Sequence, residues 1–127
     1  MTVEQLQALS DEELNALAAK LRGWKLLESD HDSWRGVTGN YYFESEDGEA
    51  ECSEGDWTPA TSRDQSGELL EWAWRNRGIL FHVGFTGGGS PGYVQFETPI
   101  THHMVRGNDA RSETIAFCAA MLAILPN

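Results

Sequence analysis

The chain has 127 residues, which suffices for one ordinary globular domain and leaves no room for a second. A hydrophobic fraction of 40% and five tryptophans supply a core, which excludes wholesale disorder. Twenty acidic residues against nine basic ones give a net charge of −11, and a surface of this sign repels the phosphates of DNA and RNA. We therefore expect no direct binding to nucleic acid.

The N-terminus, the apolar runs and the cysteines predict where the protein resides. Residues 1–5 lack the basic start of a secretory signal, and the longest apolar run, 115–125, has 11 residues where a bilayer span needs about 20. Two cysteines, Cys52 and Cys118, cannot form a disulfide framework, so we expect reduced thiols. These features predict a soluble protein of the cytoplasm without a membrane contact.

The N-terminal residues have the pattern of two short helices. Two pairs fit the capping-box spacing, in which each side chain satisfies the other's backbone donor: Thr2 with Gln5, and Ser10 with Glu13. Leucines and alanines recur at spacings of three and four and form one apolar stripe. We expect helices over residues 3–9 and 11–22, with Gly23 ending the second in the left-handed conformation.

Short segments with strand-forming residues follow. Residues 24–27 and 41–43 are candidates, and Trp34 with Val37 is a weaker one. We interpret residues 30–32, Asp-His-Asp, as a polar turn. Residues 44–62 are polar and contain glycine and proline, so they are predicted to be a connection without a helix or strand.

The next segment predicts a helix over residues 63–77 that ends at Gly78. Ser62 and Gln65 again have capping-box spacing. Three residues form the buried centre of the helix, and a tryptophan flanks each side of them: the centre is Leu69, Leu70 and Ala73, and the flanks are Trp72 and Trp74. At least one of these two tryptophans is therefore expected to be partly exposed.

The clearest strand signal is a hairpin of residues 79–85 and 93–97, because the second segment alternates apolar and polar residues. Residues 99–111 are expected to be irregular. Ser112 then caps a final helix, 113–125, that is apolar on every side beyond Thr114. Such a helix is buried on several sides or covered by a second copy, and from its apolar surface we predict a homodimer.

Two glycine-rich patterns resemble catalytic or cofactor motifs but lack their context. Gly87-x-Gly89-x-x-Gly92 matches a dinucleotide fingerprint, yet a strand follows it where the mechanism requires a helix N-terminus. Ser90 lies in a Gly-x-Ser-x-Gly pattern, but the next residue, Pro91, has no N–H to donate to an oxyanion. We interpret this segment as a hairpin tip.

No other pattern predicts a catalytic residue, a cofactor or a metal site. His102 and His103 are adjacent, so on an extended strand they would face opposite sides. Residues 30–32 lack the further ligands that a zinc site needs. Cys118 is predicted to be a small buried residue, and the acids around Cys52 would raise its pKa and reduce its nucleophilicity.

The acidic residues are concentrated in one segment. Seven acids fall between Glu44 and Asp56, and no Lys or Arg occurs between Arg35 and Arg63. Either this run is only a solvated surface, or it forms an acidic face for a basic partner. The partner-binding candidates are Glu46, Asp47, Glu49, Glu51, Glu54, Asp56 and Trp57. The indole of Trp57 is considered either an exposed anchor or a core residue.

An alternative function is the sequestration of a nucleotide-like small molecule. A glycine-rich tip exposes backbone N–H groups, tryptophan can stack on a base, and arginine can hold an anion. The candidates for this function are Arg63, Trp74, Gly87, Gly88, Gly89, Arg106 and Arg111.

Three segments resemble the phage ABA sandwich domain proteins, which are small proteins of bacteriophages and prophages. They are Gly23-Trp24, the stretch from Trp57 to Thr61 that leads to Glu68-Leu69-Leu70-Glu71, and residues 113–120. The resemblance implies an α-β-α sandwich and an origin in a phage, and it supplies no catalytic residues.

Together these observations predict a single α+β domain over residues 1–127. It is expected to be an α-β-α sandwich with a mostly antiparallel sheet of about four strands, flanked by helices near 11–22, 63–77 and 113–125. The predicted function is that of a non-enzymatic, phage-encoded binding protein that acts in the host cytoplasm on a host or anti-phage defence component. Its acidic surface would mimic nucleic acid; the alternative is the ligand-sequestering function.

Overall fold

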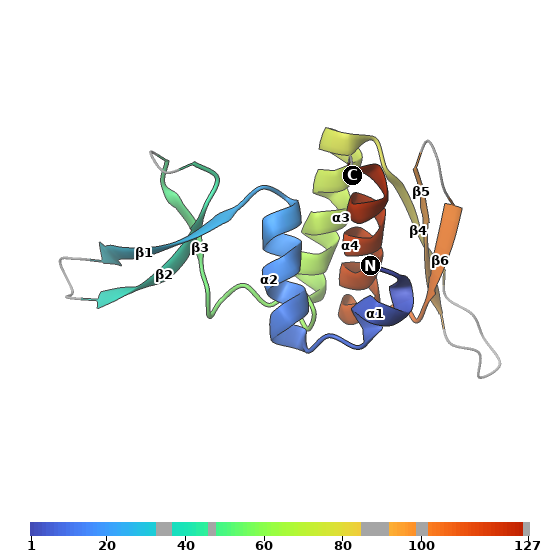
Figure 1. Ribbon diagram of the computed structural model, residues 1–127, viewed down its shortest axis with the longest axis horizontal. Coiled ribbons are helices and arrows are strands. Elements are labelled where there is room, and N and C mark those ends of the chain that lie inside the picture. The colour runs from blue at the N-terminus through green and yellow to red at the C-terminus, as the bar shows by residue number, and fades with distance from the viewer. Residues whose placement is uncertain (33–36, 46–47, 85–91, 99–101, 126–127) are drawn as a thin grey trace.

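Helices and strands alternate along the chain in the computed structural model, which describes residues 1–32, 37–45, 48–84, 92–98 and 102–125 (Figure 1). In chain order the elements are α1 (Val3–Gln7), α2 (Asp11–Leu21), β1 (Lys25–Asp32), β2 (Val37–Phe43), β3 (Ala50–Ser53), α3 (Arg63–Arg77), β4 (Leu80–Gly84), β5 (Tyr93–Glu97), β6 (His102–Arg106) and α4 (Ala110–Ile124). None of the described helices is both long and apolar enough to cross a bilayer.

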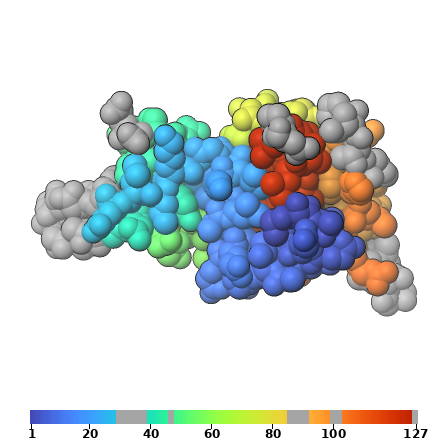
Figure 2. Space-filling view, in the orientation of Figure 1, coloured from blue at the N-terminus to red at the C-terminus, as the bar shows by residue number. Residues whose placement is uncertain are grey.

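The described strands form two antiparallel three-stranded sheets, ordered β1-β2-β3 and β4-β5-β6. The helices lie between them, and the first sheet projects away from the helices (Figure 1). We call residues 25–56, which include this sheet, the arm, and the helices with the β4–β6 sheet the body. Figure 2 shows the arm as a lobe that extends from one end of the body.

Local signals place the helix ends. The capping boxes of Thr2 and Ser10 both form, and the side chain of Ser62 accepts a hydrogen bond from the backbone of Gln65. Gly23 and Gly78 have φ of +92° and +69°, the left-handed conformation that ends a helix and that glycine adopts without a steric penalty. The helices α2, α3 and α4 run parallel, with their N-terminal turns at the same end of the body (Figure 1).

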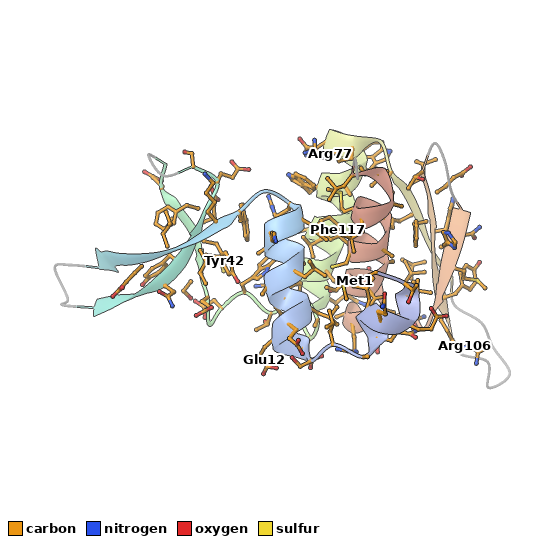
Figure 3. All side chains as sticks on the ribbon, in the orientation of Figure 1. Met1, Glu12, Tyr42, Arg77, Arg106 and Phe117 are labelled. Atoms are coloured by element: carbon orange, nitrogen blue, oxygen red, sulfur yellow. The ribbon has the colours of Figure 1, made fainter. Side chains whose placement is uncertain are left out.

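The core of the protein is built around α4. This helix contacts α1, α2 and α3 on its sides and β5 and β6 on another face, and Phe117 lies fully buried among the helices (Figure 3). Because the chain's own elements cover α4, its apolar character is explained without a second copy. The observation from which we predicted a homodimer is therefore accounted for within one chain, and the homodimer itself stays a prediction.

The β4–β6 sheet places one face on α4. Val94, Phe96 and Val105 are buried on that face, whereas Leu80 and Met104 on the other face are 46% and 62% exposed. The expected alternation along residues 93–97 is confirmed, since Val94 and Phe96 point inward.

An aromatic cluster joins the arm to the body. The rings of Trp24, Tyr42 and Trp57 contact one another, with ring centroids 4.7 to 6.5 Å apart. Trp57 Nε1 donates a hydrogen bond to the backbone carbonyl of Asn15 on α2 (2.8 Å), and the backbone N–H of Ala60 donates to Asn15 Oδ1 (2.9 Å). Two adjacent contacts to one α2 residue thus hold the segment that follows the arm.

The α+β class, the antiparallel pairing and the helices near 11–22, 63–77 and 113–125 are confirmed. The strands differ in detail, since the described residues contain two sheets of three strands where we expected one of about four. Residues 44–62 contain β3, and residues 99–111 contain β6, so neither segment is only a connection. Within the described residues both are short strands at a sheet edge with few apolar residues, which weakens their sequence signal.

Two further local expectations are wrong. Residues 30–32 continue β1 and are not a turn, because they pair with β2 across a register irregularity. The last helix begins at Ala110, since the carboxylate of Asp109 accepts hydrogen bonds from both the N–H (2.8 Å) and the hydroxyl (2.7 Å) of Ser112. Ser112 therefore lies in the first turn, and Asp109 is the cap.

Candidate functional site

A cleft of about 430 Å³ lies between the arm and α2. It is lined by Asp11, Glu12, Asn15, Ala16, Tyr42, Glu54, Gly55, Trp57, Thr58 and Thr61. Figure 3 shows Glu12 on the first turn of α2 and Tyr42 at the end of the arm that meets the body. The volume is in the range of pockets that take a small molecule or a single large side chain.

The charged residues of the cleft are all acidic. Asp11, Glu12 and Glu54 contribute carboxylates, and the lining contains no Lys or Arg. One oxygen of Asp11 binds the guanidinium of Arg111 (2.6 Å), and Glu54 Oε1 accepts a hydrogen bond from the Asn40 amide at 3.4 Å. Even with these contacts the cleft carries excess negative charge, and it therefore favours a cationic group.

Two aromatic rings contribute to the wall of the cleft. Tyr42 is 5% exposed and Trp57 is 3% exposed, and both are held by Trp24. Burial, with a smaller contribution from Glu54, raises the pKa of the Tyr42 hydroxyl, which keeps it neutral. Because both rings are buried, the carboxylates are the groups of the cleft that would attract an ammonium or guanidinium group.

The arm also presents its predicted acids to solvent. Glu49, Glu51, Glu54 and Asp56 are exposed, whereas Glu46 and Asp47 lie outside the described residues. Ten of the chain's twenty acidic residues and only two of its nine basic residues belong to the arm. The arm thus carries most of the net charge of the protein.

Of the two alternatives for Trp57, the structure supports the core residue and not the exposed anchor. Its indole is buried and hydrogen-bonded to Asn15, so it positions the cleft and offers no free surface. Polar neighbours in the sequence suggested exposure, but the indole reaches past them to α2. The expectation for the α3 tryptophans is confirmed, because Trp74 is 56% exposed while Trp72 packs on Phe117.

The structure does not bring the nucleotide-binding candidates together. Arg63 and Trp74 are separated by about 16 Å along α3, given the rise per residue, and Gly87, Gly88 and Gly89 lie outside the described residues. Figure 3 shows Arg106 far from Arg77, which ends α3 near Trp74.

Two of the arginines of this set have structural partners. Arg63 binds the carbonyl of Asn108 and lies 3.5 Å from Glu113. Arg111 binds Asp11 and the carbonyls of Gln7 and Leu9, which ties the link between α1 and α2 to α4. Ligand sequestration stays a prediction, and these contacts do not favour it.

Both cysteine thiols have a raised pKa, as the sequence predicts for Cys52. Burial raises the pKa of the Cys118 thiol to about 12, and burial together with Asp56 raises the pKa of Cys52. Within the part of the chain that the structure describes, no three His, Cys, Asp or Glu side chains gather as metal ligands would.

Sequence reasoning missed the contribution of α2 to the site. Asp11 and Glu12 begin the predicted helix 11–22, and no motif marks them as part of a site, although helix and arm meet there. One signal was present, because Asn15 is a polar residue inside the apolar stripe of α2, and it is buried. A buried amide requires hydrogen-bond partners, which here come from the segment that follows the arm.

Comparisons with protein-family models, with curated proteins and with solved structures find no match for this chain. The resemblance to the phage ABA sandwich proteins therefore stays a prediction.

Proposed function

We propose that the protein is a non-catalytic binding protein whose arm and adjoining cleft bind a basic surface of another protein. One observation carries this proposal: the projecting arm, to which half of the chain's acids belong, stands beside a cleft whose charged residues are all acidic. The arm would attract and orient the partner over a distance of about 10 Å, the Debye length near physiological salt. The cleft would take one lysine or arginine side chain.

A nucleic-acid-binding surface is the kind of partner that these charges fit. Such surfaces carry clustered Lys and Arg that ordinarily bind phosphates, and the acidic arm would present several negative charges to them. The resemblance to phage proteins supports a host or defence protein as the source of that surface. The protein would then act by occupying the groove and would convert no substrate.

Neutralising the arm tests the electrostatic part of the proposal. The arm variant combines Glu49→Gln, Glu51→Gln, Glu54→Gln and Asp56→Asn, all at exposed positions. The matched control combines Glu4→Gln, Asp64→Asn, Glu68→Gln and Glu97→Gln, which removes the same number of exposed acids from the body. Both variants must keep the circular dichroism spectrum of the wild type.

Binding to a labelled Lys/Arg-rich peptide is measured by fluorescence anisotropy at increasing salt, in parallel with capture of partners from bacterial lysate. We expect the arm variant to lose affinity about tenfold or more and the body variant to stay within about twofold. Equal loss in the two variants, or capture of the same partner by the arm variant at high salt, would contradict a specific role of the arm.

A further inference from the structure

An apolar groove lies between α3 and β4. Its lining consists of Leu70, Glu71, Trp74, Leu80, Phe81 and Val83. Trp74 and Leu80 are among the most exposed large apolar side chains in the described residues, at 56% and 46%. Neighbouring exposed apolar residues of this size mark an interaction surface more often than free surface.

We propose that this groove is the interface of a two-fold symmetric dimer in which β4 pairs antiparallel with β4 of a second copy. Within the described residues β4 is at the edge of its sheet and pairs only with β5. The N–H and C=O groups that point away from β5 therefore have no strand partner there, and a further strand would satisfy them. The dimer would contain one continuous six-stranded sheet.

The sequence of β4 is complementary to itself in this arrangement. With the two-fold axis at His82, Phe81 lies opposite Val83 of the second copy, an aromatic and β-branched pair that favours sheet formation. On the other face Leu80 lies opposite Gly84 of the second copy. The ring of Tyr93 packs over Gly84, so Leu80 would meet an aromatic surface there.

The charges of the adjoining helix are also self-complementary. Trp74 has Glu71 about one turn before it and Arg77 about one turn after it. Both are exposed; within the chain Glu71 forms an ion pair with Arg75 (2.6 Å) and Arg77 lies over the ring of Trp72, so a contact between copies would have to compete with these interactions. An antiparallel contact between two α3 helices at Trp74 places Glu71 of each copy opposite Arg77 of the other. Residues 63–125 contain six acids and five basic residues, so the charge that would oppose association belongs mostly to the arm.

The other edge of the same sheet does not share this complementarity. Self-pairing of β6 around Met104 would place the exposed His103 opposite the buried Val105 of the second copy, a polar and apolar pair that does not favour sheet formation. Self-pairing of the arm would bring two acidic sheets together. The geometry therefore assigns the dimer contact to β4 and not to these edges.

Sedimentation velocity from about 1 to about 200 µM protein tests the proposal. We expect the wild type to dimerise in this range. Leu80→Lys and Trp74→Lys, at exposed positions, should each raise the dimer dissociation constant about tenfold or more. Met104→Lys is the matched control, because Met104 is 62% exposed on the opposite edge strand and its substitution should leave the dimer intact.

A charge exchange tests the helix contact separately. Glu71→Arg and Arg77→Glu should each weaken the dimer, and the double variant should recover the wild-type dissociation constant because the pair between the copies is restored in reverse. A wild type that stays monomeric at about 200 µM would overturn the proposal, since a specific dimer of use in the cell is tighter than this. Equal dissociation by Met104→Lys and Leu80→Lys, or no recovery in the double variant, would also overturn it.

Discussion

At the scale of single residues, Asn15 and Trp57 determine how the arm meets the body. Trp57 fills the space between Trp24 and Tyr42 and donates its indole N–H to the Asn15 carbonyl, while the Asn15 side chain binds the backbone of Ala60. A buried indole needs such an acceptor, because leaving its N–H without one costs free energy. The same residue thus supplies apolar contact and a directional hydrogen bond.

Trp57→Phe should lower the free energy of unfolding by about 1–3 kcal/mol, because it removes one buried hydrogen bond and part of the ring volume. Urea denaturation followed by circular dichroism measures the change, at a protein concentration low enough for a monomer. Trp74→Phe is the control of matched chemistry and should change stability by less than about 0.5 kcal/mol, since Trp74 is exposed. A larger effect at Trp74 than at Trp57 would show that Trp57 does not hold the arm to the body.

At the scale of elements, the contact between α3 and α4 contains a buried carboxyl group. Glu113 is 6% exposed, accepts a hydrogen bond from the Ser66 hydroxyl (3.2 Å) and lies 3.5 Å from Arg63 Nε. Burial raises the pKa of the Glu113 carboxyl, and the contacts with Ser66 and Arg63 offset only part of that effect. The folded protein therefore holds this proton to a higher pH than the unfolded chain does.

The raised pKa of Glu113 makes the stability of the protein depend on pH. At neutral pH the buried, ionised carboxylate of Glu113 lowers the free energy of unfolding. As the pH falls from the raised pKa of the folded protein toward the ordinary pKa of glutamate, the folded protein binds the proton first and the free energy of unfolding rises. Glu113→Gln should thus be destabilised by no more than about 1 kcal/mol at pH 7 and should gain less stability than the wild type between pH 7 and pH 5. Urea titrations at several pH values measure this, with the exposed Glu4→Gln as control. An unchanged pH slope in Glu113→Gln would refute the assignment.

At the scale of the whole molecule, the arm and the body differ in charge and in packing. The buried cluster is drawn mainly from the helices and the β4–β6 sheet, and the arm joins it through Tyr42 and its flanking tryptophans. Where the arm meets the body, the described structure contains two buried donors without a partner, Arg22 Nε and Trp24 Nε1. Unsatisfied buried donors lower the stability of the contact that contains them.

Native-state hydrogen exchange should therefore show that the arm opens without the body. We expect the amides of β1 and β2 to exchange with an opening free energy at least about 2 kcal/mol below that of α4. Mass spectrometry of peptides from the two regions measures the difference. Equal protection of the arm and α4 would mean that the molecule opens as one cooperative unit.

Local chemistry explains why much of the fold was predictable. Capping pairs, the glycines after α2 and α3, and the alternation in β5 act within a few residues, so they are readable from the chain alone. The strands β3 and β6 were missed because edge strands need few apolar residues. The α2 side of the cleft was missed because Asp11 and Glu54 are far apart in the sequence. They line one cleft only because the arm packs against α2.

The sequence by itself determined the α+β class, the ends of α2 and α3, the hairpin and the concentration of acids in one segment, since each depends on residue type and short spacing. Only the tertiary structure decided that this segment forms a projecting sheet, that Trp57 is buried beside it, and that the chain's own elements cover α4. These outcomes depend on which surfaces pack together across long separations in the chain. Side-chain burial and hydrogen-bond partners are properties of that packing and are not encoded in any short motif.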